Sequence, residues 1–337
     1  MKNASQPQPL LNLGWIPYWN LLPFRKEFER AKLSHFSIKS GHPTAVNQWL
    51  TSGQVHLAPC SSVCLVQNPQ LEMAIPLGVA SNGETDSVYW GLTAEHLPLV
   101  NIIWERAREL RETYWTGINE GSYDSRQLAS KIWESCERYS LPFQTPLPSL
   151  NLTQNSASSS TLSQILYCLL FGFEAYKTMM SQSSFASQDT PTPIELVIGD
   201  EALMRKSSFH KVIDLGSLWK EITGLPFVYA VWQSKGAFLN GWRRKIMEIG
   251  ELSEAKMRID CASYLPTTPI LDNLGQEILL ADYWKKIYYK LGAKEYKGLL
   301  LFLCLARHFK NTPLDSNLLV KLMRWQELTT QQPSYVP

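Results

Sequence analysis

The chain has 337 residues, a formal net charge of +2 at pH 7 and a sequence pI near 8.1. This length predicts about two domains, and so small a net charge gives no electrostatic basis for binding nucleic acid. The start of the chain is polar and proline-rich, and the longest apolar run, residues 299–306, is far shorter than the roughly 20 residues that a membrane span needs. We therefore expect a cytoplasmic protein that binds neither nucleic acid nor a membrane.

The six cysteines are spread along the chain and form no C-x-x-C pair. Cys60 and Cys64 are four residues apart, which is not by itself the spacing of a zinc site. We interpret the cysteines as reduced, mostly buried thiols.

The first apolar stretch, residues 13–18, is predicted to be a short strand that leads to Asn20 and stops at Pro23. In open α/β sheets, ligands bind beyond the carboxyl ends of the strands. The carboxamide of an asparagine both donates and accepts hydrogen bonds without carrying a charge. Asn20 is therefore either a ligand contact or the cap of a helix that begins near Pro23.

The next segments alternate between short strands and helices, a pattern typical of a parallel, doubly wound sheet. Polar residues recur at the ends of these strands: Ser61 and Ser62 follow one, and Ser87 precedes another. Strand ends of one type lie along the same edge of a parallel sheet. One pocket accounts for these residues and Asn20 more simply than separate caps do. The expected strands cover residues 36–38, 55–58, 73–79 and 88–92.

Residues 95–149 break the alternation, because two amphipathic helices are expected there without a strand between them. The first is centred on Ile102, Ile103, Ala107 and Leu110. Such an inserted helical segment is interpreted as an arm, a lid or an oligomer contact.

A serine-rich loop, residues 153–161, then leads into a long apolar helix, residues 162–176. Free backbone N–H groups and hydroxyls converge where such a loop enters a helix, and together they favour an anion. The loop, which contains Ser158 and Ser159, is either an anion site or a linker with a serine cap.

A buried strand at residues 194–198 is followed by Gly199, Asp200 and Glu201, the start of another helix. The two acidic residues are either an acid/base pair or a favourable complement to the helix dipole. Adjacent residues point about 100° apart on a helix, which argues against a shared proton. A long apolar strand at residues 225–232 is expected to return the chain to the first lobe, and a helix is expected at residues 278–289.

Taken together, these residues resemble the chorismate dehydratase family of the futalosine route to menaquinone. The match covers most of the chain and runs through Gly41-His42-Pro43 and the late Tyr289, Leu291-Gly292 and Gly298. Its main pieces, in order, are Ile16-Pro17-Tyr18-Trp19-Asn20-Leu21-Leu22-Pro23, Leu57-Ala58-Pro59-Cys60-Ser61-Ser62, Ser81-Asn82-Gly83 with Ser87-Val88, Leu152-Thr153 with Ser156-Ala157-Ser158-Ser159, Ile198-Gly199-Asp200-Glu201-Ala202-Leu203, and Thr223-Gly224-Leu225-Pro226-Phe227-Val228-Tyr229-Ala230-Val231-Trp232.

The resemblance implies a two-lobed α/β fold of the type II periplasmic-binding-protein kind, with a cleft between the lobes. Its implied first lobe is discontinuous, residues 10–94 with 231–330. Residues 95–149 form the inserted helical segment, and residues 150–230 form the second lobe. The implied activity is that of a carbon–oxygen lyase, which removes water from chorismate to give 3-[(1-carboxyvinyl)oxy]benzoate. No metal or organic cofactor is implied, and the partner is a small dicarboxylate substrate.

The resemblance also assigns the site. Asn20 and Ser87 are expected at the reacting face, and the substrate-binding residues are expected to be Ser61, Ser62, Ser158, Ser159, Gly199 and Asp200. No general-base side chain is apparent among them, which suggests that the enolpyruvyl carboxylate of the substrate itself takes the proton.

The chain departs from the family pattern where Glu84 and Asp86 stand in a segment that usually reads Asp-Gly-Pro-Val-Gly-Ser. Two carboxylates repel a dianion unless they point away from it. The alternatives are a lyase for a related cyclic enolpyruvyl acid and a non-catalytic binding or sensor protein for a carboxylate metabolite.

Overall fold

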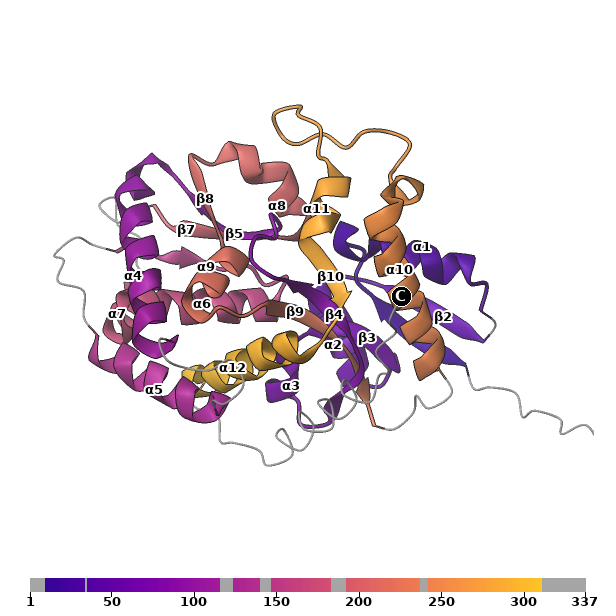
Figure 1. Ribbon diagram of the computed structural model, residues 1–337, viewed down its shortest axis with the longest axis horizontal. Helices are drawn as coiled ribbons and strands as arrows, with labels where there is room; N and C mark the ends of the chain where they lie inside the picture. Colours follow the sequence, from indigo (N-terminus) through magenta and orange to yellow (C-terminus); the bar gives the residue numbers. More distant parts are fainter. Residues whose placement is uncertain are drawn as a thin grey trace, which may run out of the picture.

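The computed structural model describes residues 10–33, 35–115, 124–139, 147–182, 192–236 and 242–310. Within these residues the chain forms two α/β lobes, each organised around its own β-sheet (Figure 1). None of the helices in these ranges is long and apolar enough to cross a membrane.

The sheet of the first lobe has six strands in the order β10-β4-β9-β3-β1-β2. Strand β1 pairs in parallel with both β2 and β3, whereas the pairs β3–β9, β4–β9 and β10–β4 are antiparallel. The predicted parallel sheet is therefore correct only for its first three strands, because β9 and β10 return from the second half of the chain in the opposite direction. The strands are β1 (Leu11–Trp15), β2 (Phe36–Ser40), β3 (Leu57–Ser61), β4 (Leu71–Ser81), β9 (Phe227–Lys235) and β10 (Ile287–Lys290).

Aromatic side chains fill the core of this lobe. Helix α1 (Leu22–Arg30) has Pro23 in its first turn and buries Phe24 and Phe28, which are one helical turn apart. The ring centroids of Phe24 and Trp232 lie 5.2 Å apart at an edge-to-face angle. Each such buried side chain stabilises the fold by about 1.5–3 kcal/mol. The other helices of the lobe are α2 (Pro43–Thr51), α3 (Cys64–Gln67), α10 (Arg243–Ile259) and α11 (Leu280–Lys286).

The predicted helix at residues 278–289 is wrong in its second half. Helix α11 ends at Lys286, and Ile287–Lys290 forms strand β10 on β4. The run Ile287, Tyr288 and Tyr289 has the β-branched and aromatic composition of a strand, and pairing with β4 outweighs the apolar pattern that suggested a helix.

The sheet of the second lobe has four strands in the order β6-β7-β5-β8. Its central strands β5 and β7 are antiparallel, and the short β6 pairs in parallel with β7. The strands are β5 (Val88–Leu92), β6 (Leu150–Asn151), β7 (Ile194–Ile198) and β8 (Lys211–Asp214), and the helices are α6 (Ala157–Phe171), α7 (Phe173–Gln182), α8 (Gly199–Arg205) and α9 (Leu215–Thr223).

The inserted segment consists of two helices, α4 (Leu97–Trp115) and α5 (Ser125–Arg138), as predicted. Ile103, Ala107 and Leu110 are almost fully buried in the core of the second lobe. Helix α4 packs against α9, and α5 packs against the C-terminal helix α12 (Ala293–Lys310). Their apolar faces are thus used inside the lobe (left side of Figure 1) rather than on a projecting arm. An oligomer contact through this segment remains a prediction.

The sheet memberships refine the proposed lobe bounds. Strand β5 lies in the second sheet, although the expected first lobe extends to residue 94, and β9 begins at Phe227, a few residues before the expected return at 231. The buried side chains of α12 belong to the apolar cluster of the second lobe. Residues 311–330 of the expected first lobe lie outside the described residues. The domain division therefore remains a proposal, with crossings between the lobes at the β4–β5, α9–β9 and β10–α12 connections.

Candidate functional site

A pocket lies between the lobes and is lined by both of them. Its cavity volume is about 70 Å³, and about 10–15 Å³ of such volume accommodates one water molecule. None of the described residues that line it has a charged side chain. They are Ile16, Tyr18, Asn20, Leu21, Pro43, Pro59, Ser61, Val79, Thr85, Ser87, Val88, Ser156, Ser159, Ile198, Gly199, Tyr229 and Ala230.

Asn20 lines this pocket from a 3₁₀ turn, Trp19–Leu21, rather than directly from the end of a strand. Strand β1 ends at Trp15, and the N-cap of α1 is Leu21, with no side-chain cap. The interpretation of Asn20 as a helix cap is therefore wrong. Its side-chain Oδ1 is buried and has no hydrogen-bond partner among the described residues. A buried acceptor of this kind is costly unless a partner satisfies it, so Asn20 is suited to receive a donor from a ligand.

The backbone around Asn20 is fixed by the C-terminal part of the first lobe. The hydroxyl of Tyr289 donates to the Asn20 carbonyl at 2.6 Å, and the indole N–H of Trp284 donates to the Trp19 carbonyl at 2.9 Å. Both aromatic side chains are fully buried. The turn is thus held on rigid elements, as a precise binding site requires.

Ser87 lines the same pocket and is almost fully buried. Its Oγ accepts a hydrogen bond from the Tyr283 hydroxyl at 3.1 Å and lies 3.0 Å from the Thr85 Oγ1. Burial raises the pKa of Tyr283 well above its usual value, so the phenol that contacts Ser87 is neutral. Asn20 and Ser87, which are 67 positions apart in the sequence, line the same pocket.

The four predicted serines divide into two pairs. Ser61 and Ser159 line the pocket, whereas Ser62 and Ser158 do not. The hydroxyls of Ser62 and Ser158 lie 3.0 Å apart, Ser62 donates to the Val228 carbonyl, and the Val63 N–H donates to Ser158. This second pair is fully buried and joins the end of β3 to the start of α6.

The serine-rich loop does cap α6, through Ser156. The Ser156 Oγ accepts from the Ser159 N–H at 3.2 Å and donates to the Ser159 Oγ at 3.0 Å. Both residues line the pocket, so the first turn of a 15-residue helix forms part of its wall. The positive end of the helix dipole favours an anion at this wall. The two alternatives for the loop are thus compatible: the cap is present, and the anion remains a prediction.

Gly199 and Asp200 contact the first lobe in different ways. Gly199 lines the pocket with φ +66°, and a Cβ there would lie 3.1 Å from the Tyr18 ring. The Asp200 Oδ1 accepts the Trp19 N–H at 2.9 Å, which links α8 to the turn that carries Asn20. Burial raises the pKa of Asp200 to about 6. Its direct contact with a ligand remains a prediction, because Asp200 is not among the residues that line the pocket.

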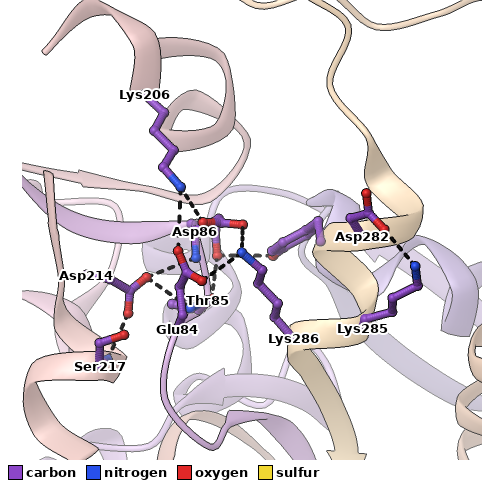
Figure 2. Close-up of polar contacts among 11 residues, drawn as sticks. Glu84, Thr85, Asp86, Lys206, Asp214, Ser217, Asp282, Lys285 and Lys286 are labelled. Atoms are coloured by element: carbon purple, nitrogen blue, oxygen red, sulfur yellow. Dashed lines mark hydrogen bonds and ion pairs between the residues drawn. The ribbon is translucent and has the colours of Figure 1, made fainter. Parts of the chain in front are cut away.

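Glu84 and Asp86 form an ion-pair cluster with Lys206 and Lys286, and none of the four lines the pocket. Lys206 comes from a 3₁₀ turn after α8 and Lys286 from the end of α11, and the two converge on the loop from opposite sides (Figure 2). The Glu84 Oε2 lies 2.9 Å from the Lys286 Nζ. The positive charges of Lys206 and Lys286 therefore offset the two carboxylates that were expected to repel an anion.

The loop that carries this cluster is held by Asp214, the N-cap of α9. One of its carboxylate oxygens accepts the N–H groups of Thr85 and Asp86, both at 2.9 Å, and the other accepts the Ser217 N–H (Figure 2). Burial raises the pKa of Asp214 to about 6. Asp86 itself has φ +61°, a conformation uncommon outside glycine, and these contacts hold it there.

The sequence did not single out several residues of the site: Tyr18, Thr85, Ser156, Tyr229 and Tyr283. Tyr229 lies in β9, and Tyr18 and Ser156 stand within motifs that carry the resemblance. Their positions in a strand or in one of these motifs could have identified them from the sequence. Nothing in the sequence pointed to Tyr283, because it contacts Ser87 from 196 positions further along the chain.

Comparison with known proteins adds to this picture. A Candida albicans gene product described as exhibiting the generic periplasmic binding protein structural fold is 11% identical, with 94% of this chain and 95% of that one covered and a TM-score of 0.49. The periplasmic aliphatic sulphonate binding protein SsuA from Escherichia coli is 10% identical, with 98% and 94% covered and a TM-score of 0.48. The predicted two-lobed α/β architecture is confirmed, and it rests on the sheet topology described above.

A family model described as menaquinone biosynthesis matches residues 140–308, just over half of the 337 residues. The match spans the serine-rich loop, most of the second sheet and the returning strand β9. The chain therefore belongs to the menaquinone biosynthesis family.

Proposed function

We propose that the protein is a chorismate dehydratase that works in the pocket between its lobes. Family membership supports an enzyme of menaquinone biosynthesis. The observation that supports the specific reaction is that Asn20 and Ser87, which the resemblance assigns to the reacting face, line one pocket.

The proposed reaction removes one proton and one hydroxide, which leave as water. The C–H bond breaks at the carbon that bears the enolpyruvyl ether, and the C–O bond breaks at the neighbouring carbon that bears the hydroxyl. The electron pair of the C–H bond completes the aromatic ring of 3-[(1-carboxyvinyl)oxy]benzoate. Aromatisation supplies the driving force.

The uncharged lining is our reason for assigning the proton from the ring carbon to a group of the substrate. No described residue of the lining is an aspartate, glutamate, histidine or lysine, and a general base has to lie within hydrogen-bond reach of the proton it abstracts. The enolpyruvyl carboxylate of the substrate is itself close to that carbon. We therefore assign the role of base to the substrate, with Asn20 and Ser87 as neutral dipoles that stabilise the charge developing around it.

Neutral donors also hold the two substrate carboxylates in this proposal. Ser156 and Ser159 at the start of α6 form one donor group, and Ser61 at the end of β3 faces the same pocket. Hydroxyls and backbone N–H groups bind carboxylates well where the site is dry and preorganised. A pocket without fixed charge also releases an anionic product more readily than an arginine clamp does.

The second candidate is a non-catalytic binding or sensor protein for a carboxylate metabolite. The uncharged lining favours it, because a pocket whose described residues include no aspartate, glutamate, histidine or lysine is also suited to binding without chemistry. The two candidates differ in turnover and not in affinity.

Incubation of the pure protein with chorismate, followed by mass spectrometry, separates them. The dehydratase is expected to yield a product lighter by one water, at a rate proportional to enzyme concentration, while Asn20→Ala protein at equal concentration reports the background. Tight binding of chorismate in calorimetry without this product would support the binding protein. An absence of both would reject chorismate as the ligand.

A further inference from the structure

Tyr283 is a buried phenol that bonds with Ser87, a residue of the expected reacting face. It lies on α11 in the first lobe and is 3% exposed. Its hydroxyl donates to the Ser87 Oγ at 3.1 Å. Tyr283 is not among the residues that line the pocket, so it acts on a ligand through Ser87.

The hydroxyls of Tyr283, Ser87 and Thr85 form a hydrogen-bonded chain. Its three hydroxyl protons exceed by one its two internal hydrogen bonds, which join Tyr283 to Ser87 and Ser87 to Thr85. The Tyr283 proton makes the first bond, and one proton of the Ser87–Thr85 pair makes the second. The remaining proton belongs to a residue of the pocket wall, since Ser87 and Thr85 both line the cavity.

We propose that Tyr283 is a positioning residue that fixes the Ser87–Thr85 pair as a hydrogen-bond donor toward the substrate hydroxyl that leaves. This inference rests on the proposed dehydratase function. A donor chain polarises each successive O–H group, so donation from Tyr283 strengthens the bond that the pair offers to the departing oxygen. Charge builds up on this oxygen in the transition state, and Tyr283 therefore contributes more to kcat than to substrate binding.

The phenol suits this task for two reasons. Its proton is retained, because burial holds the pKa of Tyr283 far above neutral pH. Its position is also fixed, because the side chain is 3% exposed on a helix of the first lobe. The Asn20 Oδ1, which has no partner among the described residues, is a separate acceptor at the pocket.

The test compares Tyr283→Phe with Tyr167→Phe in steady-state assays with chorismate. Tyr167 is a matched control: it is fully buried and its hydroxyl also makes one hydrogen bond, to the Pro148 carbonyl at 3.1 Å, but it does not line the pocket. We expect kcat of Tyr283→Phe to fall about tenfold with KM changed less than twofold, the size of one lost hydrogen bond. Tyr167→Phe is expected to keep both constants while it loses similar thermal stability.

A double variant shows whether Tyr283 acts through Ser87. If it does, Tyr283→Phe combined with Ser87→Ala is no slower than Ser87→Ala alone, because the chain is already broken. Equal kcat losses in Tyr283→Phe and Tyr167→Phe, or losses of Tyr283→Phe and Ser87→Ala that multiply in the double variant, would overturn the role of Tyr283 while leaving the dehydratase in place. An inactive wild-type protein would overturn the proposed function, and this role with it.

Discussion

The pocket and the ion-pair cluster beside it share one loop, residues 82–87, yet they differ completely in charge. Thr85 and Ser87 line a pocket whose described lining has no charged side chain, whereas Glu84 and Asp86 form ion pairs with two lysines. The residues that line the pocket alternate with those of the cluster along this segment, although Asp86, at φ +61°, is not extended. A loop with two acidic residues can therefore help to form an uncharged pocket when the acidic side chains pair with lysines outside it.

The cations of the cluster come from two different parts of the chain. Lys206 follows α8 in the second lobe, and Lys286 ends α11 in the first. Burial raises the pKa of Asp86, but hydrogen bonds from the two lysines outweigh this effect and leave the pKa below its usual value. Ion pairs with the two lysines therefore hold the loop of residues 82–87 on one side, and hydrogen bonds between neutral hydroxyls hold it on the other.

The largest effect is expected when a charge is introduced into the uncharged pocket, so that it no longer differs in charge from the ion-pair cluster. Asn20→Asp replaces a neutral amide with a carboxylate of the same shape, in a pocket whose described lining includes no lysine or arginine. Repulsion of a dianion and loss of the amide N–H donor are expected to lower kcat/KM for chorismate by about a hundredfold, or about 3 kcal/mol. Steady-state kinetics measures this effect.

Asn101→Asp is the control for that variant, since Asn101 is exposed on α4. It adds the same charge to the molecule far from the pocket lining, so we expect unchanged constants. Full activity of Asn20→Asp would contradict both the neutral pocket as a requirement and the place of Asn20 at the reacting face.

A second test uses a carboxylate that belongs neither to the pocket lining nor to the cluster. Burial raises the pKa of Asp200 to about 6, above its usual value of 3.8. A raised pKa in the fold means that the stabilisation from the protonated acid is complete below about pH 4 and is lost as the pH rises through 6. Relative to Asp200→Asn, the wild-type protein should therefore lose about 3 kcal/mol of unfolding free energy across this range.

Urea unfolding of both proteins at several pH values measures the difference, and other titrating groups cancel in the comparison. The asparagine keeps an oxygen that accepts the Trp19 N–H, so the link between the lobes is preserved. A difference that stays constant from pH 4 to pH 7 would show that Asp200 is not the buried acid we describe.

The cluster itself is tested by removing its cations. Lys206→Met/Lys286→Met leaves Glu84 and Asp86 without their partners, and we expect a loss of about 1–2 kcal/mol at pH 7. Because the pKa of Asp86 is lowered in the fold, this stabilisation is present above the usual carboxyl pKa and is lost as the pH falls below it. KM for chorismate is expected to rise several-fold, since two uncompensated charges then stand beside the pocket.

Lys285→Met is a close control, because Lys285 pairs with Asp282 on the exposed surface at 2.7 Å (Figure 2). An exposed pair of this kind contributes little to stability, because water and salt screen it. Equal effects of the Lys285 variant and the double variant, in stability and in KM, would mean that the cluster has no special role.

Sequence patterns were sufficient to predict the strands and helices that depend on the apolar and polar residues within one segment. The alternation of apolar segments predicted β3, β7 and the return of β9 to the first sheet, and apolar spacing predicted α4 and α5. The polar ends of the first strands pointed to Asn20, Ser61 and Ser87, all of which line the pocket.

The remaining features depend on contacts between distant segments, which a local pattern does not contain. Lys206 and Lys286 reach Glu84 and Asp86 from 120 and 200 positions away in the closest pairs. The direction in which each serine points was equally hidden: Ser61 and Ser62 are neighbours, yet only Ser61 lines the pocket. Adjacent residues at the end of a strand face opposite ways, and the register that decides between them is set by β9.

The smallest expected effect separates the two serines at the start of α6. Ser158→Ala removes the partner of the Ser62 hydroxyl and of the Val63 N–H, both buried, so we expect about 1 kcal/mol of lost stability and an unchanged KM. Ser159→Ala removes a hydroxyl that lines the pocket and is expected to raise KM about threefold with less effect on stability. Thermal melts and steady-state kinetics on the two variants provide the measurement. If Ser158→Ala raised KM as much as Ser159→Ala does, then the buried Ser62–Ser158 pair would be part of the substrate site. Its hydroxyls would then not have a purely structural role.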